Sequence, residues 1–204
     1  RRTLSDLDAI VMTKTKLITS CLILALVAMP VPAQARSPAP LQPLPNLDVA
    51  SYMGTWYQVL WVPNRFQKQC AADTAATYRD LGNGTVEVTN RCRQADGQID
   101  SVIGLARPPA GVARIDAGQL QPARLEVSFL PAWLRWIGAG WGAYWVVDLA
   151  EDGRYAIVSE ASREYLWVLS RKPALTSDDE RVIRDRLRAL GFELSRLETH
   201  PQGR

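Results

Sequence analysis

Gly54-Thr55-Trp56-Tyr57 opens an apolar run that covers residues 56–62 and stops at Pro63. The run has the length of one β-strand, and it follows a segment rich in proline. Trp56 at the start of a strand has two interpretations: it is an ordinary core residue, or it closes one end of a β-barrel. The sequence on either side of this stretch decides between them.

Short segments with alternating apolar residues follow the opening stretch at regular intervals. Turn sequences separate several of them, since Gly and Asn tolerate the positive φ that tight hairpins need. These turns are Gly82-Asn83-Gly84, Ala95-Asp96-Gly97-Gln98, Asp152-Gly153 and Ser162-Arg163-Glu164. The predicted strands are 56–62, 74–81, 85–93, 99–107, 125–129, 142–150, 155–161 and 165–171.

These segments predict an all-β fold, an eight-stranded antiparallel up-and-down barrel. A meander hides its edges best by closing on itself, and eight strands enclose roughly one small ligand. Residues 47–53 predict a short turn leading into Gly54, while residues 108–122 form an irregular stretch to which no element is assigned.

After the last predicted strand, the spacing of apolar residues changes from that of a strand to that of a helix. Ser177-Asp178-Asp179-Glu180 predicts a capping box at a helix start, and Gly191 predicts the stop. Ile183, Leu187 and Leu190 lie on one face of this helix, which needs an apolar partner. We therefore expect the helix to pack on the outside of the barrel, and residues 192–197 to add a short closing strand.

Residues 1–35 are predicted to be a leader. Lys14 and Lys16 precede an apolar stretch, 17–29, and Ala33 and Ala35 fit a cleavage site, so a secretory signal peptide is favoured over a membrane-spanning helix. Residues 1–11 are interpreted as an over-extended gene start. An alternative is that Cys21, in Ile18-Thr19-Ser20-Cys21, is lipidated. Residues 36–45 predict an extended proline-rich tether, and 46–204 the folded domain.

Charge and cysteine content limit the partners. Removing residues 1–35 takes away four basic and two acidic residues from totals of 24 and 21, which leaves 20 against 19. The near-neutral remainder gives no support for nucleic-acid binding. Cys70 and Cys92 are then an even pair in an oxidising compartment, which indicates a disulfide, since a metal site needs more ligands.

The histidine content argues against several enzyme classes. The single His is His200, in the C-terminal tail, which removes a Ser-His-Asp or Cys-His arrangement and most zinc sites. We expect no metal, no cofactor and no catalytic residue. An isomerase or hydrolase based on carboxylates or Tyr remains an alternative.

Three stretches in order and spacing make the sequence resemble the lipocalins, and within them the bacterial lipocalins related to apolipoprotein D, of the outer-membrane lipoprotein type. They are Gly54-Thr55-Trp56-Tyr57, Tyr144-Trp145-Val146-Val147-Asp148-Leu149 and Tyr165-Leu166-Trp167-Val168-Leu169-Ser170-Arg171, across about residues 46–197. The sequence departs from many relatives at Asp148-Leu149-Ala150-Glu151 and in the irregular stretch 108–122.

The resemblance implies structural roles for Gly54, Trp56 and Arg171, with the guanidinium lying over the indole at the closed end. It implies that the Gly82-Asn83-Gly84 and Asp152-Gly153 turns lie at that end. The loops around Cys70, Asp96, Trp136 and Arg163 then lie at the mouth. Cys70 and Cys92 fall at the same rim, which favours their pairing.

Strand alternation gives a set of inward-facing residues that are expected to contact ligand. They are Ala76, Tyr78, Val88, Asn90, Leu125, Val127, Phe129, Tyr144, Val146, Val158, Tyr165 and Trp167. A barrel filled by these side chains is the alternative. Glu160 near the rim has two interpretations, contact with a cationic head group or pairing within its own loop.

The loop 131–141 is unusually aromatic, with Trp133, Trp136 and Trp141 around Arg135. Three interpretations of this loop compete: it folds back as a lid over the pocket, it docks on a membrane surface, or it forms a dimer contact. The lid and the membrane contact are favoured over the dimer contact.

The family resemblance implies a protein that binds and stores or transports fatty acids or lysophospholipids in the bacterial cell envelope. The expected location is the periplasm or the periplasmic face of the outer membrane, and the expected state is a monomer or homodimer. An envelope interaction protein with a filled barrel, or an enzyme with this fold, is the alternative.

Overall fold

The structure is a computed structural model that describes residues 38–112, 120–121 and 123–203. The predicted signal peptide and the alternative of a lipidated Cys21 lie outside the described residues, as do residues 113–119 of the irregular stretch.

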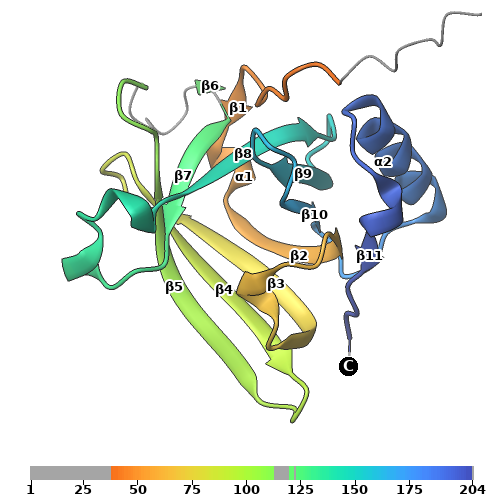
Figure 1. Cartoon of the computed structure of the whole chain (residues 1–204), viewed down its shortest axis with the longest axis horizontal. Helices are drawn as coiled ribbons and strands as arrows, with labels where there is room; N and C mark the ends of the chain where they lie inside the picture. Colours follow the sequence, from red (N-terminus) through yellow and green to blue (C-terminus); the bar gives the residue numbers. More distant parts are fainter. Residues whose placement is uncertain (1–37, 113–119, 122, 204) are drawn as a thin grey trace, which may run out of the picture. The chain divides into compact units, whose positions relative to one another are not determined.

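Eight strands among the described residues form the predicted up-and-down barrel (Figure 1). Each pairs antiparallel with the next along the chain, and β10 closes the barrel by pairing with β2. They are β2 (Gly54–Trp61), β3 (Cys70–Asp80), β4 (Val86–Gln94), β5 (Ile99–Arg107), β7 (Arg124–Ser128), β8 (Gly142–Leu149), β9 (Tyr155–Ser159) and β10 (Leu166–Ser170). The all-β barrel with one long C-terminal helix is confirmed.

Most strands begin and end close to the predicted residues. The start of β3 is an exception, and its cause is a bulge. It begins at Cys70, four residues before the predicted start at residue 74. Its register with β4 shifts at Ala72 and again before Ala75, and Asp73 between them has a positive φ of 55°. This bulge breaks the alternation of side chains, so the pattern conceals the first residues of the strand.

The segment before β2 corrects the expectation of a simple turn. β1 (Leu47–Asp48) pairs with β6 (Leu120–Gln121), and α1 (Val49–Tyr52) follows at once. Asp48 caps α1, because its Oδ1 accepts from the backbone N–H of Ala50 and of Ser51. The short helix covers the closed end of the barrel and ends just before Gly54, whose φ is 91°.

Residues 38–45 form no helix or strand, but they contact the barrel and are more than a tether. The backbone N–H of Leu44 donates to Val146 O at 2.8 Å, and its carbonyl accepts from Ala123 N at 2.9 Å. Leu41 is buried in the apolar cluster that also contains Ile183. The expectation failed because proline removes only its own N–H, and the residues between prolines keep theirs.

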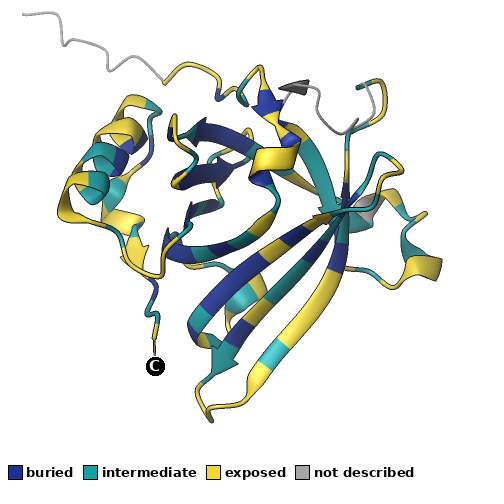
Figure 2. Cartoon of the chain, turned by 180° about the vertical axis from the view of Figure 1, so that it is seen from behind, coloured by how far each residue is buried: buried dark blue, intermediate teal, exposed yellow. Residues whose placement is uncertain are grey.

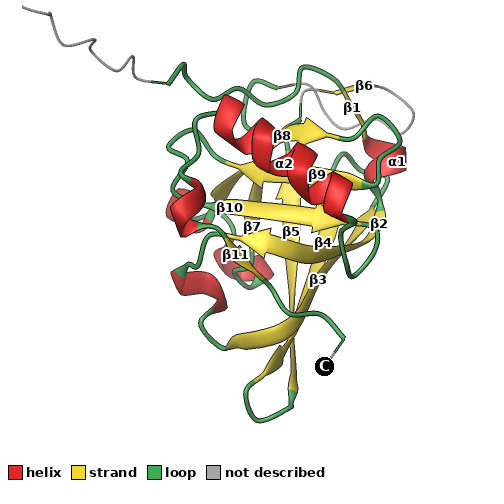
Figure 3. Cartoon of the chain, turned by 90° about the vertical axis from the view of Figure 1, so that its right-hand side faces the viewer, coloured by secondary structure: helices red, strands yellow, loops and turns green. Residues whose placement is uncertain are grey.

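The helix α2 (Ser177–Ala189) lies across the outside of the barrel (Figure 3). Ile183 and Leu187 on its inner face are fully buried. The predicted cap is displaced by one residue: Thr176, not Ser177, accepts from the backbone N–H of Asp179. Thr176 precedes the first helical residue, so its side chain reaches the N–H group three residues later.

The chain after α2 corrects the prediction of a strand at 192–197. That region holds a 3-10 helix, η4 (Leu194–Arg196), and the closing strand is β11 (Glu198–Thr199), which pairs with the mouth-side end of β2. Residues beyond β11 join β2 to β3. His200 N donates to Val59 O, and Asp73 N donates to Pro201 O.

The two sides of the barrel differ in burial (Figure 2). The strands beside α2 are buried almost throughout, whereas the mouth-side half of β5 is exposed. β5 pairs with β7 only over residues 105–107, so within the described chain its residues 99–104 have no strand on that edge. The barrel is therefore open on this side of the mouth.

Candidate functional site: the barrel interior and its mouth

The inner face of the barrel carries one hydrophobic cluster. Trp56 and Tyr52 belong to it together with most of the residues predicted to face inward. Those predicted residues are Ala76, Tyr78, Val88, Leu125, Val127, Tyr144, Val146, Val158 and Trp167. The structure thus brings them together, while Asn90, Phe129 and Tyr165 lie outside this cluster, nearer the mouth.

The closed half of the interior is filled. Tyr78, Val88, Leu125 and Tyr144 line a cavity of only about 20 Å³ there. A single water needs about 10–15 Å³ measured in this way, so an acyl chain has no room among these side chains. In this half, the predicted ligand residues pack mainly against one another.

Three tyrosine hydroxyls meet in this half. Tyr144 OH lies 2.9 Å from Tyr52 OH and 2.8 Å from Tyr78 OH. Burial raises the pKa of Tyr52 and of Tyr144 well above the ordinary value and that of Tyr78 to about 12. All three hydroxyls therefore keep their protons at neutral pH, which argues against a tyrosinate base in an enzyme.

The closed end is sealed by Arg171 and Trp56. The guanidinium carbon of Arg171 lies 3.8 Å from the centre of a Trp56 ring, the stacking that the resemblance implies. Arg171 also donates to the carbonyl oxygens of Thr55 and Ser51, at 3.0 and 2.6 Å. The Trp56 indole donates to Tyr52 O at 2.8 Å, so this contact is part of the structural seal.

The mouth half of the inner face is open to solvent. Val102 pairs with inward-facing Asn90 and is 44% exposed. Phe129 lies one residue beyond β7 and is 36% exposed; its ring lies over Gly104, where a Cβ would approach it to 2.6 Å. Tyr165 precedes β10 and stacks on Trp167, with ring centres 6.0 Å apart. An apolar surface that water reaches therefore lines the wall near the mouth.

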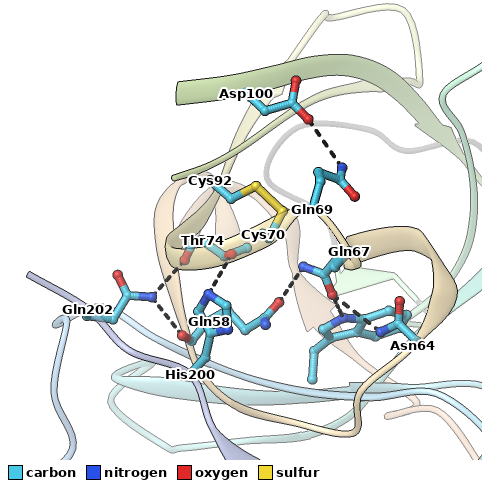
Figure 4. The surroundings of a disulfide bond; sticks show 11 residues. Gln58, Asn64, Gln67, Gln69, Cys70, Thr74, Cys92, Asp100, His200 and Gln202 are labelled. Carbon is cyan, nitrogen blue, oxygen red and sulfur yellow. Dashed lines mark hydrogen bonds between the residues drawn. A yellow bond between two sulfur atoms is a disulfide. The ribbon is translucent and has the colours of Figure 1, made fainter. Parts of the chain in front are cut away.

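A polar network interrupts this apolar wall. Gln67, in the 3-10 helix η1 (Arg65–Gln67), accepts from the Trp167 indole at 2.8 Å. The same side chain donates to Gln58 Oε1 at 2.7 Å (Figure 4). Sequence alternation could have placed Gln58 on the inner face, but an isolated Gln in an apolar strand carries no signal of its partners.

The predicted disulfide between Cys70 and Cys92 is confirmed (Figure 4). It joins the start of β3 to the end of β4, with the two Cα atoms 5.4 Å apart. The bond fixes two long strands at the mouth, where the barrel has fewer strand partners.

The aromatic loop 131–141 projects outward from the barrel and does not cover its mouth (Figure 1). Trp133 and Trp136 are 73% and 82% exposed. Trp141 departs from the prediction of a free mouth contact: its indole donates to Arg135 O at 2.7 Å, and Arg107 lies 3.7 Å above its ring. Trp141 therefore holds the loop in place, and the lid interpretation is wrong for this conformation.

Glu160 does not point a free carboxylate at a ligand. It accepts from the backbone N–H groups of Ser162, Glu164 and Tyr165, and from the Ser162 hydroxyl. Burial raises its pKa, but these hydrogen bonds outweigh burial and leave the pKa below the ordinary value. The interpretation as a loop-paired carboxylate is the correct one.

His200 is not part of a free tail. It is 3% exposed, its Nε2 lies 2.7 Å from the Thr74 hydroxyl, and its ring meets Trp61 edge-on. Burial lowers its pKa.

The described residues hold no group of three or more His, Cys, Asp or Glu side chains placed to bind a metal ion. Within the same residues, every helix is too short or too polar to span a bilayer.

Comparison with known families matches residues 47–202 to the family described as a lipocalin-like domain. The chain belongs to this family, whose members bind small hydrophobic ligands. Its members are in general binding and transport proteins rather than enzymes.

The relatives come from distant sources. The chain is 42% identical over 126 residues to a protein of Acanthamoeba polyphaga mimivirus named as a lipocalin, covering 62% of this chain and 68% of that one. It is 30% identical over 152 residues to the outer membrane lipoprotein Blc of Escherichia coli, covering 74% and 77%. Among solved structures, insecticyanin of Manduca sexta matches with a TM-score of 0.58 at 16% identity, over 78% and 83% of the chains, which supports the fold alone.

Proposed function

We propose that this protein binds lipids with a long acyl chain, such as fatty acids or lysophospholipids, in the mouth half of its barrel. The proposal places this activity in the bacterial cell envelope, where the lipid is stored or carried. The predicted signal peptide and the similarity to the Blc lipoproteins, which are named for the outer membrane, support that location.

One observation carries the ligand site: the inward-facing wall near the mouth is apolar and exposed to solvent at Val102 and Phe129. Covering such a surface with an acyl chain is favourable by about 0.8 kcal/mol per buried methylene. Phe66, 56% exposed and 5.4 Å from the Tyr165 ring, extends the same surface to the rim. We assign the predicted contacts Asn90, Phe129, Tyr165 and Trp167 to this region.

The β5 strand offers a matched test. Val102 faces inward and is 44% exposed, and its neighbour Ile103 pairs with Thr89, faces outward and is 57% exposed. Val102→Glu should weaken oleate binding at least tenfold in a tryptophan-fluorescence titration, because it places a charge on the lipid surface. Ile103→Glu, with the same chemistry on the outer face, should leave binding unchanged. Equal effects of the two variants would refute this site.

The exposed aromatic loop supports membrane docking. Trp133 and Trp136 project from it, and Trp prefers the interface between lipid and water. Replacing both by Ser should reduce cosedimentation with phosphatidylethanolamine and phosphatidylglycerol vesicles. The control is Ile103→Ser, which removes an exposed apolar side chain elsewhere. Unchanged sedimentation of the double variant would leave dimerisation as the remaining interpretation of the loop.

The filled closed half favours a second candidate, an interaction protein with no lipid ligand. Native mass spectrometry of protein purified from its own envelope separates the two. Lipid that co-purifies with the chain supports the first candidate. A lipid-free chain that also fails to take up added oleate supports the second.

A further inference from the structure

The orientation of the Gln67 amide is determined by its donors. The Trp167 indole N–H can only donate, and it lies 2.8 Å from Gln67 Oε1. Asn64 Nδ2 donates to the same oxygen at 3.3 Å, while Asn64 Oδ1 accepts from Phe66 N. Two donors therefore converge on Gln67 Oε1, and its nitrogen must face the other way.

The orientation of Gln58 follows from that of Gln67. Gln67 Nε2 donates to Gln58 Oε1 at 2.7 Å, so Gln58 Nε2 points away from Gln67. Gln58 is 2% exposed, and within the described part of the chain its Nε2 is the buried side-chain atom without a hydrogen-bond partner. Two N–H groups are thus out of water and unpaired, an arrangement that proteins normally avoid.

Gln58 faces the barrel interior beside the apolar wall of the mouth half, although its Nε2 has almost no exposed surface. Gln58 pairs with Leu169 of β10, which belongs to the inner cluster, and follows Trp56 by one inward step along β2. Its amide therefore lies above the sealed floor and on the Trp167 side of the mouth half. Tyr165 and Trp167 continue the same wall toward the rim.

We infer that Gln58 Nε2 donates a hydrogen bond to an uncharged carbonyl oxygen of the bound lipid, the ester carbonyl of an acyl ester. This inference rests on the proposed lipid-binding function and narrows its ligand class. The side chains of this network, Gln58, Gln67, Asn64 and Trp167, carry no charge. An ionised carboxylate placed there would lose its hydration without a counter-ion, whereas an ester carbonyl loses much less. Acyl esters, including lysophospholipids, should thus be preferred over ionised fatty acids.

The test compares ligands that share a chain and differ at the carbonyl. Methyl oleate, sodium oleate and an octadecene of matched chain are titrated into the full chain and followed by tryptophan fluorescence. The wild type should bind methyl oleate about two- to tenfold more tightly than octadecene, the range expected for one neutral hydrogen bond. Gln58→Met, which keeps the shape and removes the donor, should bind both equally. The control Gln98→Met, at an exposed hairpin, should keep the preference.

A second variant keeps the network and removes only the donor. In Gln58→Glu, a carboxylate still accepts from Gln67 but donates nothing at neutral pH, so the ester preference should vanish. A buried carboxyl has a raised pKa and becomes a donor when protonated, so the preference should return on acidification. The wild type, in which His200 also titrates beside Gln58, should keep its ester preference over the same pH range and is the control. The infrared band of a carbonyl-labelled ester should shift to lower wavenumber in the wild type and not in Gln58→Met.

The outcomes separate this inference from the proposed function. A wild type that binds ester and octadecene equally well overturns the role of Gln58 and leaves lipid binding intact. A wild type that binds none of the three ligands overturns lipid binding itself. If Gln58→Met does not fold, as judged by circular dichroism, the pH dependence of Gln58→Glu decides.

Discussion

The closed and mouth halves of the barrel are made from the same strands but differ in what their inner faces do. Trp56, Arg171 and the three tyrosines fill the closed half, where the tyrosine hydroxyls bond to one another and Arg171 and Trp56 donate to backbone carbonyls. The mouth half has exposed apolar side chains and the unpaired Gln58 Nε2. We therefore expect stability to be concentrated in the closed half and, under the proposed function, ligand binding in the mouth half.

The largest effect is expected at the floor. Trp56→Ala removes a fully buried indole and should lower the free energy of unfolding by about 3 to 5 kcal/mol in urea titrations. Trp133→Ala, at an exposed position, should change it by less than about 0.5 kcal/mol. A folded Trp56→Ala protein should keep its ligand preference. A changed preference would show that the floor takes part in binding.

The disulfide is the main covalent support of the mouth half. Cys70 and Cys92 are 22 residues apart, and replacing both by Ala should cost about 3 kcal/mol of unfolding free energy. The wild type under reducing conditions should approach the melting temperature of the double variant. If neither treatment changes the melting temperature, the strands at the mouth do not need the bond.

The tyrosine triad gives a graded test within the closed half. Tyr144→Phe removes the middle hydroxyl and leaves those of Tyr52 and Tyr78 buried without their partner, at a cost of about 1 to 3 kcal/mol. Tyr52→Phe removes an end of the chain of hydroxyls and leaves the second bond intact, so it should cost less. Denaturant unfolding of both variants provides the comparison, and the reverse order would contradict the network.

The fold could be predicted because its signals are local. Alternation and turn residues marked each barrel strand, and the period of Ile183 and Leu187 marked the helix. The failures arose where pairing is not local. Leu44 bonds to β8 across the fold, and β11 pairs with β2, which lies far away in the sequence. A strand of two residues, such as β11, is too short to show any periodicity in the sequence.

The site was predicted less completely, since alternation says which face a side chain is on but not its height along the barrel. Tyr78 and Tyr144 face inward as expected, yet lie in the filled half. Gln58, Gln67 and Tyr52 were not predicted because their importance comes from partners on other elements. His200 was placed in the C-terminal tail with no structural role, whereas tertiary packing buries it against Thr74.

Replacing His200 is expected to have the smallest effect on the free energy of unfolding. This effect depends on pH in the mouth half and not in the closed half. The pKa of His200 is lowered in the folded protein, mainly by burial and despite Asp73 nearby, so the unfolded chain binds a proton at a higher pH than the folded one. Stability from this group is therefore unchanged above a pH of about 6.5 and falls as the pH drops below it, by at most about 1.4 kcal/mol per pH unit.

His200→Gln should flatten the pH dependence of urea unfolding between about pH 7 and pH 5, relative to wild type. The closed half should contribute nothing here, because its tyrosines stay protonated throughout. An equal slope in wild type and variant would show that His200 accepts a proton without disturbing the join between β2 and β3.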